Sequence, residues 1–295
     1  MPRVLLLLGI VLLACSLLRA EPETAAPAGN AADRIAAALA TLKPDDPATW
    51  TAVEDGLVGE GRDALPALQD ALTLQSAALA KAQPAEMERP RLCGMALGAA
   101  IARLSWGWNP REKIEAWISR LETKDGEPYQ LPTRPVFLND PAFGKVFPMY
   151  IFYAARCPDD KAPLPLRGHN LFIMRNDGAL KHLANAQDLE AFFLAQVRAV
   201  GEDEEGVAIG VTAAWLRLTQ EFFQDGTLCF LIPAESLKAS YRTSTVTSIN
   251  GWRASGQAVL APGGKLTGDI TVNLTFDAAG QLKTITELRA LTPAP

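Results

Sequence analysis

The spacing of the apolar residues changes along this chain, and that change constrains the fold more than any other feature. Between residues 31 and 122, apolar side chains recur three and four positions apart, as Ile35, Leu39 and Leu42 do. This spacing places side chains on one face of an α-helix. In residues 266–276, apolar and polar residues alternate instead, which is typical of a strand with one buried face in an antiparallel sheet. We therefore predict an α+β protein, in which a helical N-terminal region is followed by an α+β domain with an antiparallel meander sheet.

Changes in composition divide the chain into five segments. They are a signal peptide at 1–20, a flexible tether at 21–30, a helical region at 31–122, a connector at 123–168 and the α+β domain at 169–292. The connector is rich in proline and aromatic residues, and proline prevents regular helix there. Within it, residues 146–155 fit either a short strand or a short helix. We expect the connector as a whole to pack against one or both of the regions that it joins.

Turn and cap residues refine the predicted elements. Asn109 and Asn185 each precede an apolar helical stripe, so we expect both to cap the N-terminus of a helix. The sequence Asn176-Asp177-Gly178 separates two short runs of the chain and predicts a hairpin turn. In the last third of the chain, the predicted strands are 228–232, 237–247, 252–260, 266–276 and 281–289.

The N-terminus has the three parts of a secretory signal. Arg3 supplies the positive charge, residues 4–13 are apolar apart from Gly9, and small residues follow. Two cleavage patterns remain open: a cut after Ala20, or a bacterial lipobox in which Cys15 carries a lipid. The first predicts a periplasmic or secreted protein. The second predicts a lipid-anchored envelope lipoprotein whose only membrane contact is that anchor, and an uncleaved anchor is a third alternative.

Two parts of the chain resemble known folds. Residues 43–80 resemble a HEAT-type helical repeat unit, on the basis of Val53–Gly59 followed by Ala64–Leu68. No clean second copy is found, so the resemblance implies one helical hairpin used for packing or for protein contact. Residues 170–290 resemble cystatin-like and nuclear-transport-factor-like α+β folds in the order of their elements alone. No residue role is carried over from those families.

Charge and chemical motifs narrow the function. The net charge is −5 and no basic cluster occurs, which argues against nucleic acid as a partner. The sequence contains no Walker, zinc-protease or serine-hydrolase motif. Its two histidines, His169 and His182, lack the spacing of metal ligands. We therefore expect no cofactor and no bound metal.

The cysteines bear on the compartment and on reactivity. Beyond the signal segment the chain has Cys93, Cys157 and Cys229, which allow three disulfide pairings with one thiol left over. We interpret Cys93, in a predicted helix, and Cys229, in a predicted strand, as small buried hydrophobic residues. Arg156 could lower the pKa of the neighbouring Cys157, which makes this thiol a nucleophile candidate, although no histidine lies near it in the sequence.

Two classes of function follow. The first is an exported, non-catalytic protein-interaction or cell-envelope module, which binds an unknown protein partner in the envelope. The second is a small-ligand-binding protein or pocket enzyme that uses the concave sheet of the C-terminal domain, so catalysis stays open. The pocket candidates for the second class are His182, Trp215, Tyr241 and Trp252. A buried carboxylate among them would favour that class.

Overall fold

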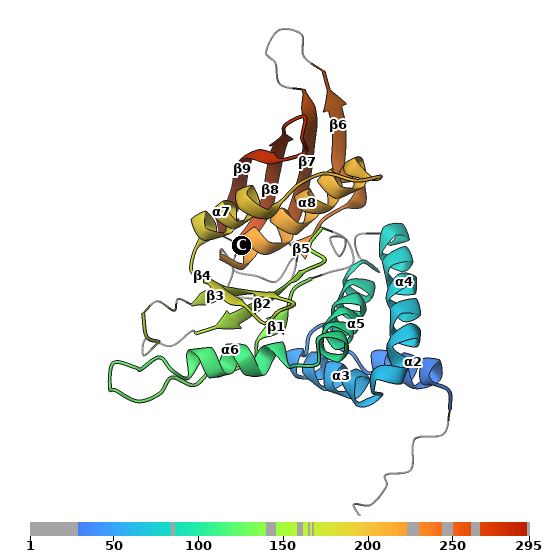
Figure 1. Ribbon diagram of the computed structural model, residues 1–295, viewed down its shortest axis with the longest axis vertical. Helices are drawn as coiled ribbons and strands as arrows, with labels where there is room; N and C mark the ends of the chain where they lie inside the picture. The colour runs from blue at the N-terminus through green and yellow to red at the C-terminus, as the bar shows by residue number, and fades with distance from the viewer. Residues whose placement is uncertain are drawn as a thin grey trace, which may run out of the picture.

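The protein has the predicted α+β architecture (Figure 1). Five α-helices come first among the described residues, then one antiparallel sheet, then two more α-helices, and last a second antiparallel sheet. The computed structural model describes residues 29–83, 86–139, 146–157, 162–164, 166, 168–222, 230–243, 250–260 and 266–293. The predicted signal segment, most of the predicted tether, Cys15, Ala20 and Cys229 lie outside these residues. Within the described part of the chain, no helix is long and apolar enough to cross a membrane.

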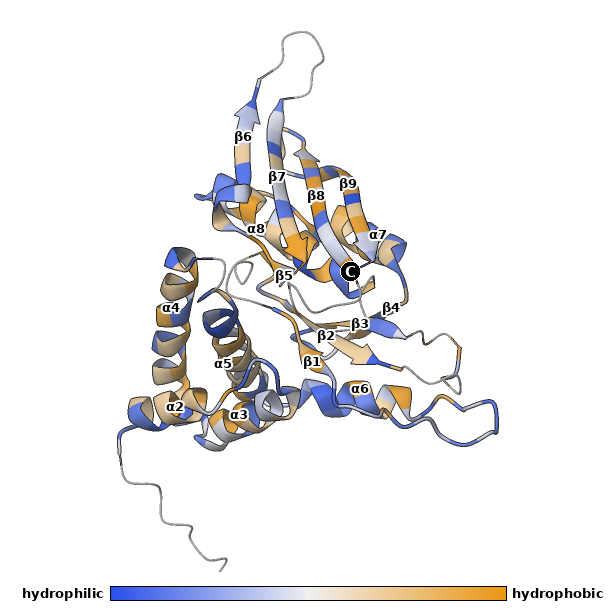
Figure 2. Cartoon of the chain, turned by 180° about the vertical axis from the view of Figure 1, so that it is seen from behind, coloured by the Kyte–Doolittle hydropathy of each residue, from blue (hydrophilic) through white to orange (hydrophobic). Residues whose placement is uncertain are grey.

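Helix α5 is the centre of the N-terminal region. The helices here are α2 (Ala31–Ala40), α3 (Pro47–Gly59), α4 (Leu65–Lys81), α5 (Glu88–Trp106) and α6 (Pro110–Ile118). Helices α3 and α4 each pack mainly on α5, and α4 lies beside α5 in both Figure 1 and Figure 2. Small residues on α5, such as Ala99 and Ala100, are fully buried and let its neighbours approach closely. The backbone at Gly107, with φ of +75°, ends the helix.

The predicted helix caps at Asn109 and Asn185 are confirmed. The Asn109 side chain accepts a hydrogen bond from the Arg111 N–H at 3.1 Å, at the start of α6. The Asn185 side chain accepts from the Asp188 N–H at 2.9 Å, at the start of α7 (Ala186–Gln196). Each cap satisfies one of the N–H groups that the first turn of a helix leaves without an intrahelical partner.

The first sheet includes strands from the segment that we expected to be a connector. Its order is β1-β2-β3-β4, and all of its neighbours are antiparallel. The strands are β1 (Val136–Phe137), β2 (Tyr150–Arg156), β3 (His169–Arg175) and β4 (Leu180–Leu183). The predicted turn between β3 and β4 is confirmed, with Gly178 at φ of +84°.

The prolines of residues 123–168 lie outside these strands, and that explains why β1 and β2 can form. Strand β2 contains no proline, so its backbone can pair on both sides. Aromatic residues of the same segment then pack together: the rings of Phe147 and Phe152 are 5.1 Å apart, and those of Phe137 and Tyr153 are 5.5 Å apart. The predicted connector therefore supplies half of a sheet.

The second sheet contains the predicted C-terminal strands. They are β5 (Phe230–Leu231), β6 (Lys238–Arg242), β7 (Gly251–Leu260), β8 (Leu266–Phe276) and β9 (Leu282–Pro293). The order is β5-β7-β8-β9, and β6 pairs with β7 along the same edge as β5. The alternation in β8 is confirmed, because Ile270, Val272 and Leu274 are buried and the residues between them are not.

Helices α7 and α8 (Glu204–Thr219) lie on one face of the second sheet (Figure 1). Seen from behind in Figure 2, the strands stand in front of these helices. Side chains on that outer face are mostly polar and exposed, for example Thr267, Asn273 and Thr286. The sheet therefore has one packed face and one face toward water.

Candidate functional site

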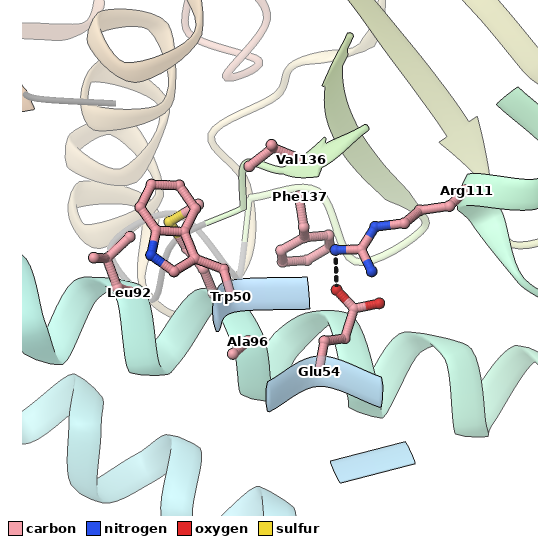
Figure 3. A pocket seen from close by; sticks show the side chains of 8 residues that line it. Trp50, Glu54, Leu92, Ala96, Arg111, Val136 and Phe137 are labelled. Atoms are coloured by element: carbon pink, nitrogen blue, oxygen red, sulfur yellow. Dashed lines mark ion pairs between the residues drawn. The ribbon is translucent and has the colours of Figure 1, made fainter. Parts of the chain in front are cut away.

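A buried carboxylate joins three helices of the N-terminal region. Glu54 of α3 lies with its Oε1 3.0 Å from Nη1 of Arg103 in α5, and its Oε2 is 2.5 Å from Nη2 of Arg111 in α6. Figure 3 shows the Glu54 and Arg111 side chains pointing toward one another. Only 1% of Glu54 and 6% of Arg111 are exposed to solvent. The two ion pairs of Glu54 therefore connect helices α3, α5 and α6 inside the protein.

The charged network continues from Glu54 to the surface. Arg103 Nη1 also lies 2.6 Å from Oδ1 of Asp55, and the other Asp55 oxygen is 3.2 Å from Nη1 of the exposed Arg134. Arg111 Nε donates to the carbonyl of Pro135 at 2.8 Å. The network thus holds one end of the segment formed by residues 129–134, which follows the turn after α6.

The environment shifts the pKa values of these groups in opposite directions. Burial raises the pKa of Glu54, and the Arg111 and Arg103 guanidiniums oppose that rise. Burial also acts to raise the pKa of Asp55, but its hydrogen bond and charge interaction with Arg103 bring this pKa below its ordinary value. Because each carboxylate lies against a guanidinium, the network is suited to holding helices together.

A small cavity lies beside the ion pair. Its volume is about 20 Å³, which is enough for one water molecule. Among the described residues, no partner is found for Arg111 Nη1 or for the buried Tyr153 hydroxyl, and burial raises the pKa of Tyr153. A water in this cavity could accept a hydrogen bond from Arg111. The cavity is lined by Trp50, Glu54, Leu92, Met95, Ala96, Arg111, Val136 and Phe137 (Figure 3).

A larger, open groove lies on the outer side of α6. Its volume is about 510 Å³. Helix α6 and the residue after it form one wall through Glu115, Ala116 and Ser119, and the segment 129–134 forms the other. The lining is mixed, with apolar contributions from Ala116, Leu131 and Pro132, and Glu115 and Arg134 carrying opposite charges.

The segment along this groove is held at both of its ends. At one end, the Tyr129 N–H donates to the Leu121 carbonyl at 2.8 Å, and Tyr129 itself is buried. At the other end, Arg111 holds the carbonyl of Pro135. Within the described residues, the backbone N–H groups of Gln130, Leu131 and Thr133 have no backbone partner. Residues that line the groove therefore include backbone donors without a backbone partner in the described structure.

The four pocket candidates do not lie together. Trp215 is on α8, and its Nε1 donates to Glu287 of β9 at 2.7 Å. Tyr241 and Trp252 are neighbours in the second sheet, with ring centroids 5.6 Å apart. Trp252 Nε1 donates to Glu204 at the start of α8, at 3.0 Å. His182 is a residue of the first sheet. The structure thus brings the three aromatic candidates to one sheet, which His182 does not share.

Side chains of α8 pack against the second sheet at β7. A Cβ added at Gly256 of β7 would lie 2.9 Å from Thr212 and 3.1 Å from Leu216, both of α8. Val211 and Leu216 are fully buried there. Helix α8 therefore sits directly on the strands at this point of the sheet.

His182 is held by the first sheet and by α6. Its Nε2 lies 2.9 Å from Oδ1 of the buried Asn170. Its ring stacks near Phe172 and Trp117, with centroid distances of 4.9 Å and 5.3 Å. Burial lowers the pKa of His182, and the charge of Asp188 acts against that shift. The surroundings therefore favour a neutral, hydrogen-bonded imidazole.

The two described cysteines, Cys93 and Cys157, are both buried. Cys93 lies inside α5, as expected for a small hydrophobic residue, and burial raises the pKa of its thiol. Cys157 follows β2 and is 2% exposed, so it does not face solvent as a reactive thiol would. In the part of the chain that the structure describes, no group of three or more His, Cys, Asp or Glu side chains could hold a metal ion.

Sequence reasoning did not find the groove or the Glu54 network. A signal for the network does exist, because Glu54 directly follows Val53 and precedes Leu57 by three positions, so it falls on the buried side of α3. A carboxylate at such a position needs a partner. The groove has no comparable signal, since it forms where a helix and an irregular segment meet.

Comparison with protein-family models, with curated proteins and with solved structures finds no match to this chain.

Proposed function

We propose that this protein is an exported, non-catalytic interaction module that holds a peptide segment of a partner protein in the groove between α6 and residues 129–134. The observation that carries the proposal is the segment 129–134 itself. Both of its ends are anchored, while the N–H groups of Gln130, Leu131 and Thr133 have no backbone partner among the described residues. A bound peptide can pair with such groups along its own main chain.

The side chains of the groove suit a polypeptide. Ala116, Leu131 and Pro132 supply apolar surface for the side chains of a bound segment. Glu115 and Arg134 lie on opposite walls, and opposite charges at a rim orient a peptide and set its direction. Arg134 is already held near Asp55, so it reaches the groove from a defined position.

The network beneath the groove supports the same function. Arg111 connects the buried Glu54 to the Pro135 carbonyl, which is the end point of the groove segment. A binding site that is held in place before the partner arrives loses less conformational entropy on binding. The groove is therefore built on a rigid base rather than on a loose loop.

The compartment is part of this proposal. The charged, apolar and small-residue pattern of residues 1–20 supports export. Cleavage after Ala20 would leave the groove in a periplasmic or secreted protein, and lipidation of Cys15 would leave it in an envelope lipoprotein. The helical hairpin implied by the HEAT-type resemblance is in keeping with a protein-contact role, since such units serve as contact surfaces.

Peptide selection tests the proposal. A phage library of random peptides is selected against the purified protein, and the enriched peptides are synthesised with a fluorescent label. Ala116→Trp places a large side chain at an exposed groove position, so we expect roughly tenfold weaker binding or more by fluorescence anisotropy. Ala78→Trp, at an exposed position of α4, is the matched control and should bind as the unaltered protein does. Equal affinity of both variants, or no enriched peptide, would contradict the proposal.

A further inference from the structure

Strand β9 leaves one long edge of the second sheet open. It pairs with β8 from Leu282 to Pro293, and no other described strand pairs with it. Among the described residues, the backbone hydrogen bonds on its other side lie at its start, where Leu282 N–H donates to the Val197 carbonyl and Ala199 N–H donates to the carbonyl of Gly280, just before the strand. An uncovered edge of this length is a template for pairing with a further strand.

Two copies of strand β9 are complementary in charge and apolar character when they pair in antiparallel fashion around Leu288. If two copies of β9 pair in antiparallel fashion with Leu288 opposite Leu288, then Glu287 of each copy lies opposite Arg289 of the other. The same register sets Ile285 opposite Leu291. Both pairs then occur twice, once on each side of the two-fold axis.

The surroundings of these residues favour this register. Leu288 is 71% exposed, the second largest exposed fraction among the large hydrophobic residues of the described chain, and the pairing would bring it against its own copy. Glu287 and Arg289 already form an ion pair with each other on the same face of the strand. Trp215 Nε1 also donates to Glu287, which fixes the carboxylate at the sheet edge.

We propose that the protein forms a two-fold dimer in which β9 pairs with β9 of a second copy, centred on Leu288. Opposite charges directly across from one another stabilise strand pairing, and like charges destabilise it. The occupant that fits the edge is therefore a second copy of this chain. The dimer joins two second sheets into one continuous sheet and does not involve the α6 groove.

Disulfide trapping tests the register directly. In the proposed dimer the Cα atoms at position 288 are directly opposite, within the range that a disulfide spans. We expect Leu288→Cys to form covalent dimers under mild oxidation. Thr286→Cys should not cross-link to itself, because position 286 lies opposite Ala290 of the other copy. A mixture of Thr286→Cys and Ala290→Cys should cross-link. The unaltered protein controls for its own cysteines.

A charge variant provides the second measurement. In the Arg289→Glu variant, the new glutamate of each copy lies opposite Glu287 of the other copy, so two pairs of like charges face one another. We therefore expect the dimer dissociation constant, measured by analytical ultracentrifugation, to rise roughly tenfold or more. Circular dichroism establishes that the variant is folded. A monomer at all concentrations for the unaltered protein, or cross-linking of Thr286→Cys alone equal to that of Leu288→Cys, would overturn the proposal. Neither readout depends on a peptide in the groove.

Discussion

At the scale of single residues, the packing of the N-terminal helices depends on Glu54. This carboxylate lies between two guanidiniums in the interior, where a charge without a partner is costly. Replacing Glu54 by Gln keeps the shape of the side chain and removes its charge, so that Arg111 loses its only ionic partner in the described structure. We expect the free energy of unfolding to fall by about 3–5 kcal/mol, measured by urea denaturation.

The matched control for this prediction is at the exposed end of the same network. Arg134 is 61% exposed at its side chain and pairs with Asp55 at 3.2 Å. Exposed pairs contribute about 0–1 kcal/mol, so Arg134→Ala should change the unfolding free energy by no more than that. A Glu54→Gln variant that is no less stable than Arg134→Ala would contradict the structural role of Glu54.

The lowered pKa of His182 makes the free energy of unfolding depend on pH. The groups around it are Trp117 of α6, Asn170 and Phe172 of β3, and Asp188 of α7. Burial lowers its folded-state pKa below the ordinary value of 6.5, so the unfolded chain binds the proton more readily. The contribution of neutral His182 to the free energy of unfolding is therefore fully present above about pH 6.5. It is lost as the pH falls through the folded-state pKa.

Two experiments check the behaviour of His182. An NMR titration should give one of the two histidines a pKa below 6.5, and the His182→Gln variant assigns the resonance. In the same variant, the loss of unfolding free energy between pH 6.5 and pH 5 should be smaller than in the unaltered protein. An identical pH dependence in both proteins would show that His182 is not the group responsible.

Local residue chemistry was predictable, and long-range pairing was not. The caps at Asn109 and Asn185 were predicted correctly because a cap needs only the three residues that follow it. The partners of Glu54 could not be predicted, since Arg103 is 49 positions away in the sequence. Which guanidinium meets a buried carboxylate depends on how whole helices pack.

At the scale of elements, the contact between α8 and β7 requires a glycine. A Cβ at position 256 would come within 2.7 Å of Leu237 and 2.9 Å of Thr212. Gly256→Val should therefore push α8 away from the sheet and lower the unfolding free energy by about 1–3 kcal/mol, measured by thermal or urea unfolding.

The control is Gly56→Ala in α3, where nothing lies within 4 Å of the added Cβ. That variant should be about 0.5–1 kcal/mol more stable, because alanine favours helix. A Gly256→Val variant with unchanged stability would show that α8 does not pack as described.

The strands differed in how well the sequence predicted them. Strand β8 matches its predicted bounds because each of its residues faces either the core or water. Strands β1 and β2 were not predicted as a pair, because they are buried among aromatic residues and show no alternation. The prolines around them suggested a connector, but a strand can form between prolines when none of its own paired residues is proline, as in β1 and β2.

At the scale of the whole molecule, the proposed export predicts the mass of the purified protein. We expect the protein purified from its native host to begin at Glu21, as cleavage after Ala20 requires. Intact-protein mass spectrometry measures this directly. A mature chain that begins at Cys15 with attached acyl chains would instead establish a lipoprotein, and a chain that begins at Met1 would contradict export with cleavage.

The α6 groove was beyond sequence reasoning for a physical reason. Its two walls come from a helix and from an irregular segment whose ends are held by Leu121 and by Arg111. Neither wall has a residue pattern that differs from an ordinary surface. The helical region was predicted, but the function proposed for it depends on where residues 129–134 lie after the chain has folded.

Amide hydrogen exchange tests directly whether a peptide binds in the groove between α6 and residues 129–134. The amides of Gln130, Leu131 and Thr133 should exchange quickly in the protein alone, and they should become protected when a peptide obtained by selection is added. The amide of Tyr129, bonded to the Leu121 carbonyl, is the internal control and should be protected in both states. Protection by the peptide at another surface, with residues 130–133 unchanged, would contradict the proposed function.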